Sequence, residues 1–256
     1  MSALPAWSEP RTAIVTGGGR GIGLAISTRL AAEGAAVAVW DIDGDTAAAA
    51  ATTIGEAGGR AISVVVDVAE RAQIDAGVEE VRSRLGTATI LVNNAALSPF
   101  EKFLEVSRDA FDRVMAVNAR GTFECCQAVV PGMIDAGWGR IVNIASSSAQ
   151  TGSPLQVHYS ASKGAVIAMT RSLAQVLGPK GITVNTIPPS FVDTPALRGA
   201  EEDGFLGRVE TIQQAIPVRR VGRPEDIAAA CAYLTRDEAG YITGQVIGVN
   251  GGRVMA

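Results

Sequence analysis

The sequence predicts an α/β fold in which a single domain is built on a doubly wound, mostly parallel sheet of about seven strands, with helices on both faces. Short β-branched apolar runs alternate with longer segments of helical length and composition, as in repeated strand-helix-strand units. Right-handed crossovers then place helices on both faces of the sheet. The 256 residues, 47% of them hydrophobic, suffice for one large core, and the sequence contains no internal repeat or long linker.

The predicted elements alternate along the chain as strand and helix. Because the apolar runs are short and β-branched, we expect strands buried on both faces, at residues 13–15, 35–40, 62–66, 90–92, 141–144, 182–187 and 246–249. Helices are expected at residues 22–33, 74–85, 111–133, 157–177 and 225–234, and the alanine-rich stretch 47–51 is a good helix former. In such a sheet ligands bind beyond the carboxyl ends of the strands. Functional residues are therefore sought directly after each strand.

Charge and residue counts argue against several classes of function. The net charge of −4 disfavours nucleic acid and anionic membranes as partners, and no apolar run reaches the roughly 18 residues of a membrane span. Cys125, Cys126 and Cys231 lack a disulfide or metal-binding spacing, and His158 is the only histidine, so we expect neither a hydrolase triad nor a metal site. We predict an irregular tail at residues 1–10 and, since this start lacks a secretory signal, a cytoplasmic protein.

A glycine-rich turn directly after the first strand predicts a dinucleotide site. Gly17, Gly19, Gly21 and Gly23 lead into a helix that runs to Glu33. Glycines allow a sharp turn and a close approach of the backbone to a pyrophosphate, and the helix N-terminus offers free N–H groups to the phosphates. Such turns also occur in ordinary loops, but the position between the first strand and the first helix favours the binding interpretation.

The residue at the end of the second strand indicates which cofactor is bound. Asp41 lies eighteen residues beyond Gly23, where a carboxylate accepts hydrogen bonds from an adenosine ribose and repels a 2′-phosphate. Asp41 therefore favours NAD over NADP, although Arg20 could face a phosphate and Asp41 could be a simple turn former. Polar residues also follow the next two strands at the same sheet edge, at Asp67 and at residues 93–94, where Asx turns are an equal alternative.

Tyr159, Lys163 and Ser146 form a candidate reactive group. Tyr159 and Lys163 are four residues apart on a predicted helix and share one face, which by itself is a routine surface pattern. A neighbouring ammonium favours the phenolate and moves a tyrosine pKa from ~10 toward neutral pH, where the phenol can act as a base. Ser146 follows a predicted strand and could hold a substrate oxygen, whereas Ser147 and Ser148 are expected to cap the next helix.

Several motifs occur along the chain in a fixed order: Thr16-Gly17-x-x-x-Gly21-x-Gly23, Asp67, Asn93-Asn94-Ala95, Asn118, Ser146, Tyr159-x-x-x-Lys163 and Val184-Asn185. In this order and spacing they resemble the classical short-chain dehydrogenases/reductases, from residue 11 to residue 256. The resemblance implies a Rossmann-like fold and an oxidoreductase that transfers a hydride between a nicotinamide cofactor and an alcohol or ketone.

The resemblance also implies a role for each candidate. Tyr159 would take the hydroxyl proton during oxidation and return it during reduction, while Ser146 would orient the substrate oxygen. Lys163 would lower the pKa of Tyr159 and hold the nicotinamide ribose, and Asn118 would position a water in a proton relay.

The cofactor site is expected to extend along the sheet edge. Asp67 and Val68 would lie at the adenine, Asn94 near the adenosine-side ribose, and Val192 and Thr194 at the carboxamide. The predicted cofactor-binding residues are Gly17, Gly19, Arg20, Gly21, Ile22, Gly23, Asp41, Asp67, Val68, Asn94, Ala95, Tyr159, Lys163, Pro189, Val192 and Thr194.

The segment 188–217 is predicted to be a lid over the site, with an ordinary surface excursion as the alternative. Its prolines and glycines break any long helix, while Phe191 and Leu197 are among its apolar side chains. Ser190 stands where the family pattern has glycine, and with Pro188 it stiffens the entrance to the segment. Ala96, also in place of a glycine, is a smaller departure.

The favoured substrate is a hydrophobic or cyclic secondary alcohol or ketone, oxidised or reduced with NAD. The predicted substrate residues are Leu97, Ser98, Pro99, Ser146, Ala149, Gln150, Gln156, Tyr159 and Phe191. The alternatives are a 3-oxoacyl thioester reductase acting on acyl carrier protein, whose usual NADPH preference Asp41 opposes, and a catalytically silent nucleotide-binding protein. The resemblance implies a homotetramer that packs through residues 111–133 and 157–177, with Gly251–Gly252 near a neighbour.

Overall fold

The computed structural model describes residues 6–255, and a six-stranded parallel sheet runs through its centre. The strands are β1 (Thr12–Thr16), β2 (Ala36–Asp41), β3 (Arg60–Val65), β4 (Ile90–Asn93), β5 (Gly139–Ile144) and β6 (Ile182–Ile187), in the spatial order β3-β2-β1-β4-β5-β6. All strands but the edge strand β3 are buried along their whole length. The order reverses between β1 and β4, so a crevice for ligands opens there at the carboxyl ends of the strands.

The predicted seventh strand at residues 246–249 is wrong. This segment makes only isolated parallel bridges, between Thr186 and Val246 and between Pro189 and Val249. Pro188, which lies between Thr186 and Pro189, has no amide hydrogen to donate, so the ladder is interrupted between these two bridges.

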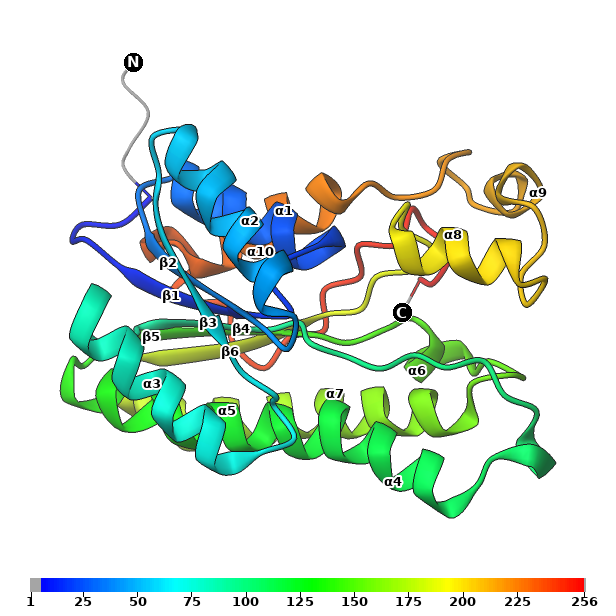
Figure 1. Cartoon of the computed structure of the whole chain (residues 1–256), viewed down its shortest axis with the longest axis horizontal. Helices are drawn as coiled ribbons and strands as arrows, with labels where there is room; N and C mark the ends of the chain where they lie inside the picture. The colour runs from blue at the N-terminus through cyan, green and yellow to red at the C-terminus, as the bar shows by residue number, and fades with distance from the viewer. Residues whose placement is uncertain (1–5, 256) are drawn as a thin grey trace.

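Helices cover both faces of the sheet (Figure 1). One face carries α1 (Gly21–Ala32), α2 (Gly44–Glu56) and α10 (Pro224–Thr235), and the other carries α3 (Arg71–Leu85), α4 (Arg108–Met115), α5 (Gly121–Asp135) and α7 (Val157–Leu177). Neighbouring strand residues contribute to opposite cores: Val15 packs in the cluster that contains Ile26 and Ile227, whereas Ile14 packs in the cluster that contains Met133. The doubly wound fold is therefore confirmed.

The segment predicted as one helix at residues 111–133 is two helices joined by a wider turn. A π-helical turn, η2 (Ala116–Arg120), lies between α4 and α5. Such a turn inserts one residue into a helix and often occurs at functional sites. It contains Asn118.

Short elements complete the chain. They are η1 (Phe103–Glu105), α6 (Ser148–Thr151), η3 (Gly178–Lys180), α8 (Pro195–Glu202), α9 (Val209–Gln214) and η4 (Asp237–Ala239). In Figure 1, α8 and α9 lie at one end of the molecule, beyond the carboxyl ends of the strands. The expected lid segment thus folds into two short helices at the sheet edge where ligands are expected.

The first described residues form no helix or strand but are fastened to the domain. Trp7 is buried, and its indole N–H donates to the carbonyl of Thr235 at the end of α10 (2.6 Å). The amide of Ser8 donates to the Asp237 carboxylate (2.6 Å). Residues 1–5 of the predicted tail lie outside the described part of the chain.

Candidate active site

The turn between β1 and α1 is shaped so that only glycine fits at its closest contact. Gly17 and Gly21 have positive φ angles of 58° and 54°, and a Cβ on Gly23 would overlap the carbonyl oxygen of Gly17. Helix α1 begins at Gly21 without a side-chain cap. The N–H groups of its first turn therefore remain available to an anion, and the turn fits the pyrophosphate of a dinucleotide.

The Asn94 side chain holds this turn in place through hydrogen bonds. Its side-chain N–H groups donate to the carbonyls of Thr16 (3.1 Å) and Gly17 (2.9 Å). The Thr16 hydroxyl accepts hydrogen bonds from the amides of Asn94 and Ala95 (both 3.0 Å). The side-chain donors of Asn94 thus hold the glycine turn rather than pointing freely toward a ribose.

Two acidic residues meet at the end of β2. The buried Asp41 carboxylate accepts hydrogen bonds from the amides of Gly19 (3.1 Å) and Asp43 (3.2 Å). Asp43 caps α2, and hydrogen bonds from Thr46, with a smaller contribution from the charge of Arg20, lower the pKa of Asp43. Asp43 was not among the predicted site residues, although an aspartate just before an alanine-rich helix is a cap signal.

The end of β3 closes this side of the crevice. The Asp67 carboxylate accepts a hydrogen bond from the amide of Ala69 (2.9 Å), as in an Asx turn. Val68 is buried against α5, where a Cβ on Gly121 would come within 2.7 Å of the Val68 carbonyl oxygen. Asp67 and Val68 therefore lie at the same sheet edge as Asp41, as predicted.

Ser146, Tyr159 and Lys163 come together beyond the carboxyl end of β5. The side chains of Ser146 and Tyr159 line the same cavity, and Ser146 acts to lower the pKa of Tyr159. The Lys163 Nζ lies 5.8 Å from the centre of the Tyr159 ring and donates to the Ile144 carbonyl (2.8 Å). The Ser146 Oγ in turn accepts hydrogen bonds from the amide (3.2 Å) and hydroxyl (2.9 Å) of Ser148. Ser148 thus orients Ser146 in addition to starting α6.

Burial changes the protonation of both titratable groups. It lowers the pKa of Lys163 from 10.5 to about 8, because a buried ammonium loses its hydration. Burial also raises the pKa of Tyr159, and Ser146 acts in the opposite direction. The net direction for Tyr159 is thus opposite to the lowering expected from Lys163, since the Lys163 ammonium donates to Ile144 and not to the phenol oxygen.

Asn118 joins the loop after β4 to the helix of Tyr159. Its side-chain oxygen accepts from the Leu97 amide (2.8 Å), and its side-chain nitrogen donates to the Leu97 carbonyl (2.8 Å) and the Ser162 hydroxyl (3.0 Å). The Ser162 hydroxyl donates to the backbone carbonyl of Tyr159 (2.7 Å). The Asn118 side chain is therefore engaged in positioning other segments.

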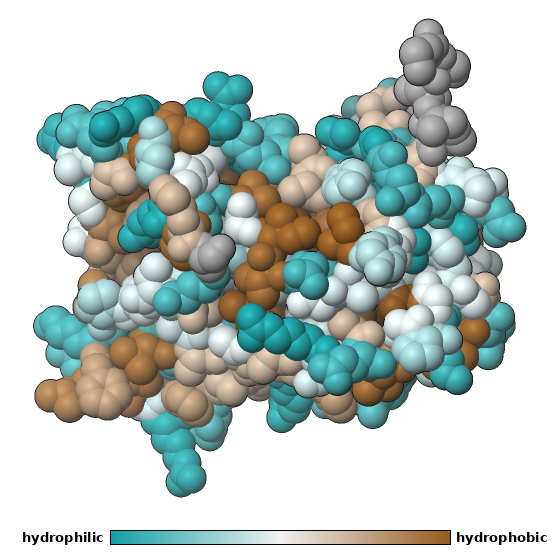
Figure 2. Space-filling view, turned by 180° about the vertical axis from the view of Figure 1, so that it is seen from behind, coloured by the Kyte–Doolittle hydropathy of each residue, from teal (hydrophilic) through white to brown (hydrophobic). Residues whose placement is uncertain are grey.

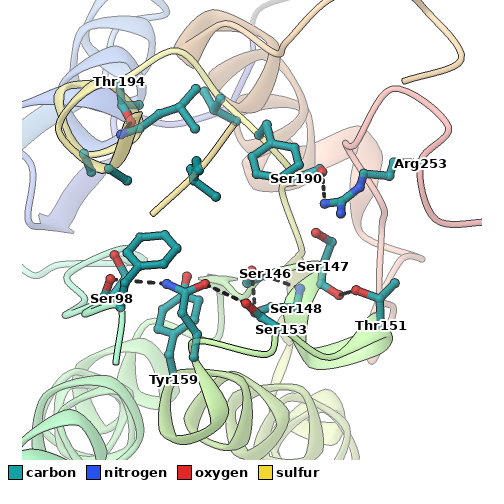
Figure 3. A pocket seen from close by; sticks show the side chains of 18 of the residues that line it. Ser98, Ser146, Ser147, Ser148, Thr151, Ser153, Tyr159, Ser190, Thr194 and Arg253 are labelled. Carbon is teal, nitrogen blue, oxygen red and sulfur yellow. Dashed lines mark hydrogen bonds between the residues drawn. The ribbon is translucent and has the colours of Figure 1, made fainter. Parts of the chain in front are cut away.

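A cavity of about 390 Å³ opens beside Ser146 and Tyr159. In Figure 3, hydroxyl side chains occupy the side formed by β5, α6 and α7, opposite the segment that carries Ser190 and Thr194. The hydroxyl side includes Ser98, Ser146, Ser147, Ser148, Thr151, Ser153 and Tyr159, and the apolar lid side includes Phe191, Val192, Ala196, Leu197, Ala200 and Leu206. Figure 2 shows the molecular surface hollowed on the face seen from behind, with hydrophobic residues around the hollow.

The cavity contains some of the predicted substrate residues and not others. Ser98, Gln156 and Phe191 line it together with Ser146 and Tyr159. The predicted residues Leu97, Pro99, Ala149 and Gln150 are not among those that line it.

Two residues at this end of the molecule, Phe100 and Arg253, were not predicted from the sequence. Phe100 lines the cavity and stacks on Phe205 of the lid segment (5.5 Å between ring centres), and Arg253 lines the cavity from the C-terminal segment. No motif identifies them, because they meet the site through contacts between distant parts of the chain.

Comparison with known proteins agrees with this geometry. Residues 17–253 match the family described as Enoyl-(Acyl carrier protein) reductase. The 3-oxoacyl-[acyl-carrier-protein] reductase FabG of Chlamydia trachomatis is 37% identical over 243 residues, which cover 94% of this chain and 96% of that protein. The chain belongs to the short-chain dehydrogenases/reductases. Membership of this family, which the motifs predicted, is thereby confirmed.

Two further relatives show the breadth of this family. Sorbitol dehydrogenase of Cereibacter sphaeroides is 39% identical over 256 residues, covering 97% of this chain and 99% of that protein. A solved structure described as an NAD(P)-dependent gluconate 5-dehydrogenase from Beutenbergia cavernae, with NADP bound at low occupancy, has a TM-score of 0.91 and 34% identity and covers 98% of this chain and 99% of that one. Like its relatives, this short-chain dehydrogenase/reductase is a nicotinamide-dependent oxidoreductase of alcohol and carbonyl groups.

Residues 6–255 of this short-chain dehydrogenase/reductase contain neither a membrane-spanning helix nor a cluster of metal-binding side chains. No helix in this range is long and apolar enough to cross a membrane. Within the same range, no group of three or more histidine, cysteine or acidic side chains could hold a metal ion.

Proposed function

We propose that this enzyme is an NAD-dependent dehydrogenase of secondary alcohols in which Ser146, Tyr159 and Lys163 are the catalytic residues. The observation that carries the proposal is that Ser146 and Tyr159 line one cavity, with the Lys163 ammonium 5.8 Å from the centre of the Tyr159 ring. Asn118 is a positioning residue, since it ties the loop after β4 to the helix of Tyr159.

In this mechanism Tyr159 moves the proton. During oxidation the phenolate accepts the proton of the substrate hydroxyl, while Ser146, oriented by Ser148, donates a hydrogen bond to the substrate oxygen. Lys163, whose ammonium lies 5.8 Å from the centre of the Tyr159 ring, would hold the nicotinamide ribose. A bound nicotinamide supplies the hydride acceptor.

The ends of β1 to β4 supply the residues proposed to hold the cofactor. Gly17, Gly21 and Gly23 form the turn for the pyrophosphate, and Asp67 and Val68 lie toward the adenine. Asp41 and Asp43 place two carboxylates at the end of β2, which supports NAD over NADP because both would repel a 2′-phosphate.

The test is a cofactor and substrate panel. NAD and NADP are each supplied with cyclic, aryl and linear secondary alcohols and with sorbitol and gluconate, and the formation of the reduced cofactor is followed by absorbance. We expect turnover with NAD, and a fall of about 10²–10⁴-fold in kcat for Tyr159→Phe with cofactor binding retained. Unchanged turnover by Tyr159→Phe would refute the assigned role, and turnover with NADP alone would refute the cofactor preference.

Reduction of a 3-oxoacyl thioester is the second candidate. The relatives named as FabG support it. Activity on a carrier-bound 3-oxoacyl thioester that exceeds activity on every free alcohol and ketone would establish this candidate in place of the first.

We also propose that residues 188–217 act as the substrate lid. Leu197 and Ala200 of α8 and Leu206 after it line the cavity, and Phe205 stacks on Phe100 of the opposite wall. These contacts would hold the segment over a bound substrate and exclude water.

A homotetramer in the cytoplasm is the proposed state of the enzyme. Phe111 of α4, Phe123 of α5 and Val176 of α7 expose apolar side chains on helices that the family resemblance assigns to subunit contacts. The three cysteines are buried and free, as suits a reducing compartment. Light scattering should give the mass of four chains, and the mass of one chain would exclude this assembly.

A further inference from the structure

Among the residues that line the cavity, Arg253 is the only one with a charged side chain. The other polar members carry hydroxyl or amide groups, and no acidic side chain lies in the lining. The cavity therefore contains a positive charge that its own walls do not neutralise, in a chain whose net charge is −4.

The Arg253 side chain is held in place by two neighbours. Its guanidinium carbon lies 4.4 Å from the centre of the Phe191 ring, within the range of a cation–π contact. Its Nη1 donates a hydrogen bond to the Ser190 hydroxyl (3.2 Å). Ser190 is the residue that departs from the glycine of the family pattern, so this departure supplies the acceptor that orients Arg253.

The backbone of Arg253 is fixed as well. The Asn250 side chain accepts a hydrogen bond from the Gly252 amide (3.0 Å) and donates one to the Val254 carbonyl (3.1 Å). Gly251 and Gly252, with φ angles of 67° and 84°, form the turn that brings the chain back to the cavity. The turn therefore presents Arg253 from a defined position.

Within residues 6–255 no carboxylate lies within ion-pair distance of Arg253. Two other arginines in or near the lid are paired: Arg198 with Asp193 and Glu201, and Arg220 with Asp226. A guanidinium has five N–H donors, and one donor of Arg253 is used by Ser190. The remaining donors are free to bind an oxyanion in two-pronged geometry.

We infer that Arg253, oriented by Ser190 and Phe191, binds an anionic group of the substrate. The inference rests on the proposed function. It makes the substrate a hydroxy or oxo compound whose alcohol or carbonyl lies at Ser146 and Tyr159 while an oxyanion lies at Arg253, on the far side of the same cavity (Figure 3). The oxyanion is the carboxylate of a small acid or the phosphate of a thioester carrier. An anionic substrate differs from the hydrophobic or cyclic secondary alcohol or ketone predicted from the sequence. The sequence alone does not show that Arg253 reaches the cavity.

The test compares pairs of substrates that differ only in charge. A hydroxy acid is compared with its methyl ester, and an aldonic acid with the alditol of the same chain length. A coenzyme A thioester compared with its short N-acetylcysteamine analogue separates a carrier phosphate from a substrate carboxylate. Wild-type enzyme is compared with Arg253→Gln, Arg253→Lys and Ser190→Gly, and with Arg60→Gln, which removes an exposed arginine of the distant strand β3.

We expect Arg253→Gln to lower kcat/KM for the anionic member of the responding pair by about 10- to 100-fold, the range of a hydrogen bond to a charged group, and to change the neutral member by less than about twofold. Arg253→Lys should retain part of the preference, and Arg60→Gln should retain all of it. Equal losses for both members, or a wild-type preference for the neutral member, would overturn the inference.

A binding measurement distinguishes failure of the proposed function from failure of the inference about Arg253. Calorimetric titration of the enzyme saturated with cofactor follows binding of each anionic ligand without turnover. If no substrate turns over with either cofactor, the proposed function fails, and weaker binding of the anion by Arg253→Gln than by wild type still supports the inference. Equal binding by both proteins overturns it.

Discussion

At the scale of single residues, the Asp41 carboxylate serves two purposes that a substitution can separate. It accepts hydrogen bonds from the amides of Gly19 and Asp43, and it places a negative charge where an adenosine ribose would lie. Asn retains one acceptor oxygen but removes the charge.

We therefore predict that Asp41→Asn moves the NAD to NADP ratio of kcat/KM toward NADP by about 10- to 100-fold, because like charges in close contact cost several kcal/mol. Steady-state kinetics with both cofactors measures this ratio. Asp45→Asn, which removes an exposed charge from the first turn of α2, is the control and should leave the ratio unchanged. An unchanged ratio in Asp41→Asn would show that Asp41 does not select the cofactor.

The buried charge of Lys163 lowers the stability of the folded protein. Its folded-state pKa of about 8, against 10.5, means that the folded protein holds this proton less tightly than the unfolded chain does. Below pH 8 the group is protonated in both states and the folded state bears the full cost of the buried ammonium. Between pH 8 and 10.5 the unfolded chain binds more protons, so this contribution to stability rises with pH.

We predict that Lys163→Met has a higher free energy of unfolding than wild type at pH 7, by up to about 3 kcal/mol, since one pKa unit corresponds to about 1.36 kcal/mol. The loss of the hydrogen bond to the Ile144 carbonyl reduces this gain. The difference should shrink from pH 8 to pH 9.5. Urea unfolding across this range measures it, with the exposed Lys180→Met as control. A variant less stable than wild type by a constant amount at every pH would contradict the prediction.

At the scale of elements, α1 and its turn depend on one close contact. A Cβ at Gly23 would overlap the Gly17 carbonyl oxygen, so the helix could not stay packed on the turn. We predict that Gly23→Ala weakens NAD binding by at least about 100-fold, because a displacement of about 1 Å at a site can have that effect. Calorimetry with NAD tests this.

Gly55 provides the matched control. It lies in α2 with nothing within 4 Å of the position of an added Cβ. Gly55→Ala should raise the free energy of unfolding by about 0.5–1 kcal/mol through helix propensity and leave NAD binding unchanged. Normal NAD binding by Gly23→Ala would show that the close contact is not needed.

The elements also show what sequence patterns can and cannot predict. Strands β1, β2, β4, β5 and β6 are buried on both faces, and this burial appears in the sequence as short runs rich in β-branched apolar residues. The π-helical turn at Asn118 cannot be recognised in the sequence, because one extra residue in a turn leaves the composition of the helix unchanged. Val246–Val249 has the composition of a strand, so the sequence predicted a seventh strand there. The ladder is interrupted because Pro188, in another segment of the chain, has no N–H group to donate.

The candidate site likewise contains residues that could be predicted from the sequence and residues that could not. Ser146, Tyr159 and Lys163 could be predicted because they lie within one strand-helix unit, whose geometry follows from spacing. Arg253 and Phe100 could not, because they reach the cavity through contacts between distant segments, Arg253 with Ser190 and Phe100 with Phe205.

At the scale of the whole molecule, the N-terminal segment is fastened to α10 and η4, at the end of the molecule remote from α8 and α9 (Figure 1). Trp7 packs in the same core cluster as Ile227 and Cys231 of α10 and donates to the Thr235 carbonyl. The Trp138 indole donates to Asp237 (3.1 Å), whose carboxylate also receives the Ser8 amide. The segment before β1 is irregular, yet these contacts make it part of the domain.

We therefore predict that Trp7→Ala lowers the free energy of unfolding by about 3 kcal/mol, as expected for a large side chain removed from a core, while KM for NAD and for substrate stays within about twofold of wild type. Trp7→Phe keeps most of the packing and loses the hydrogen bond to Thr235, so its loss should be about 1 kcal/mol. Urea unfolding and steady-state kinetics measure the two properties separately. A Trp7→Ala variant as stable as wild type would mean that this segment only covers the domain, and a raised KM would mean that its contacts with α10 extend to the active site.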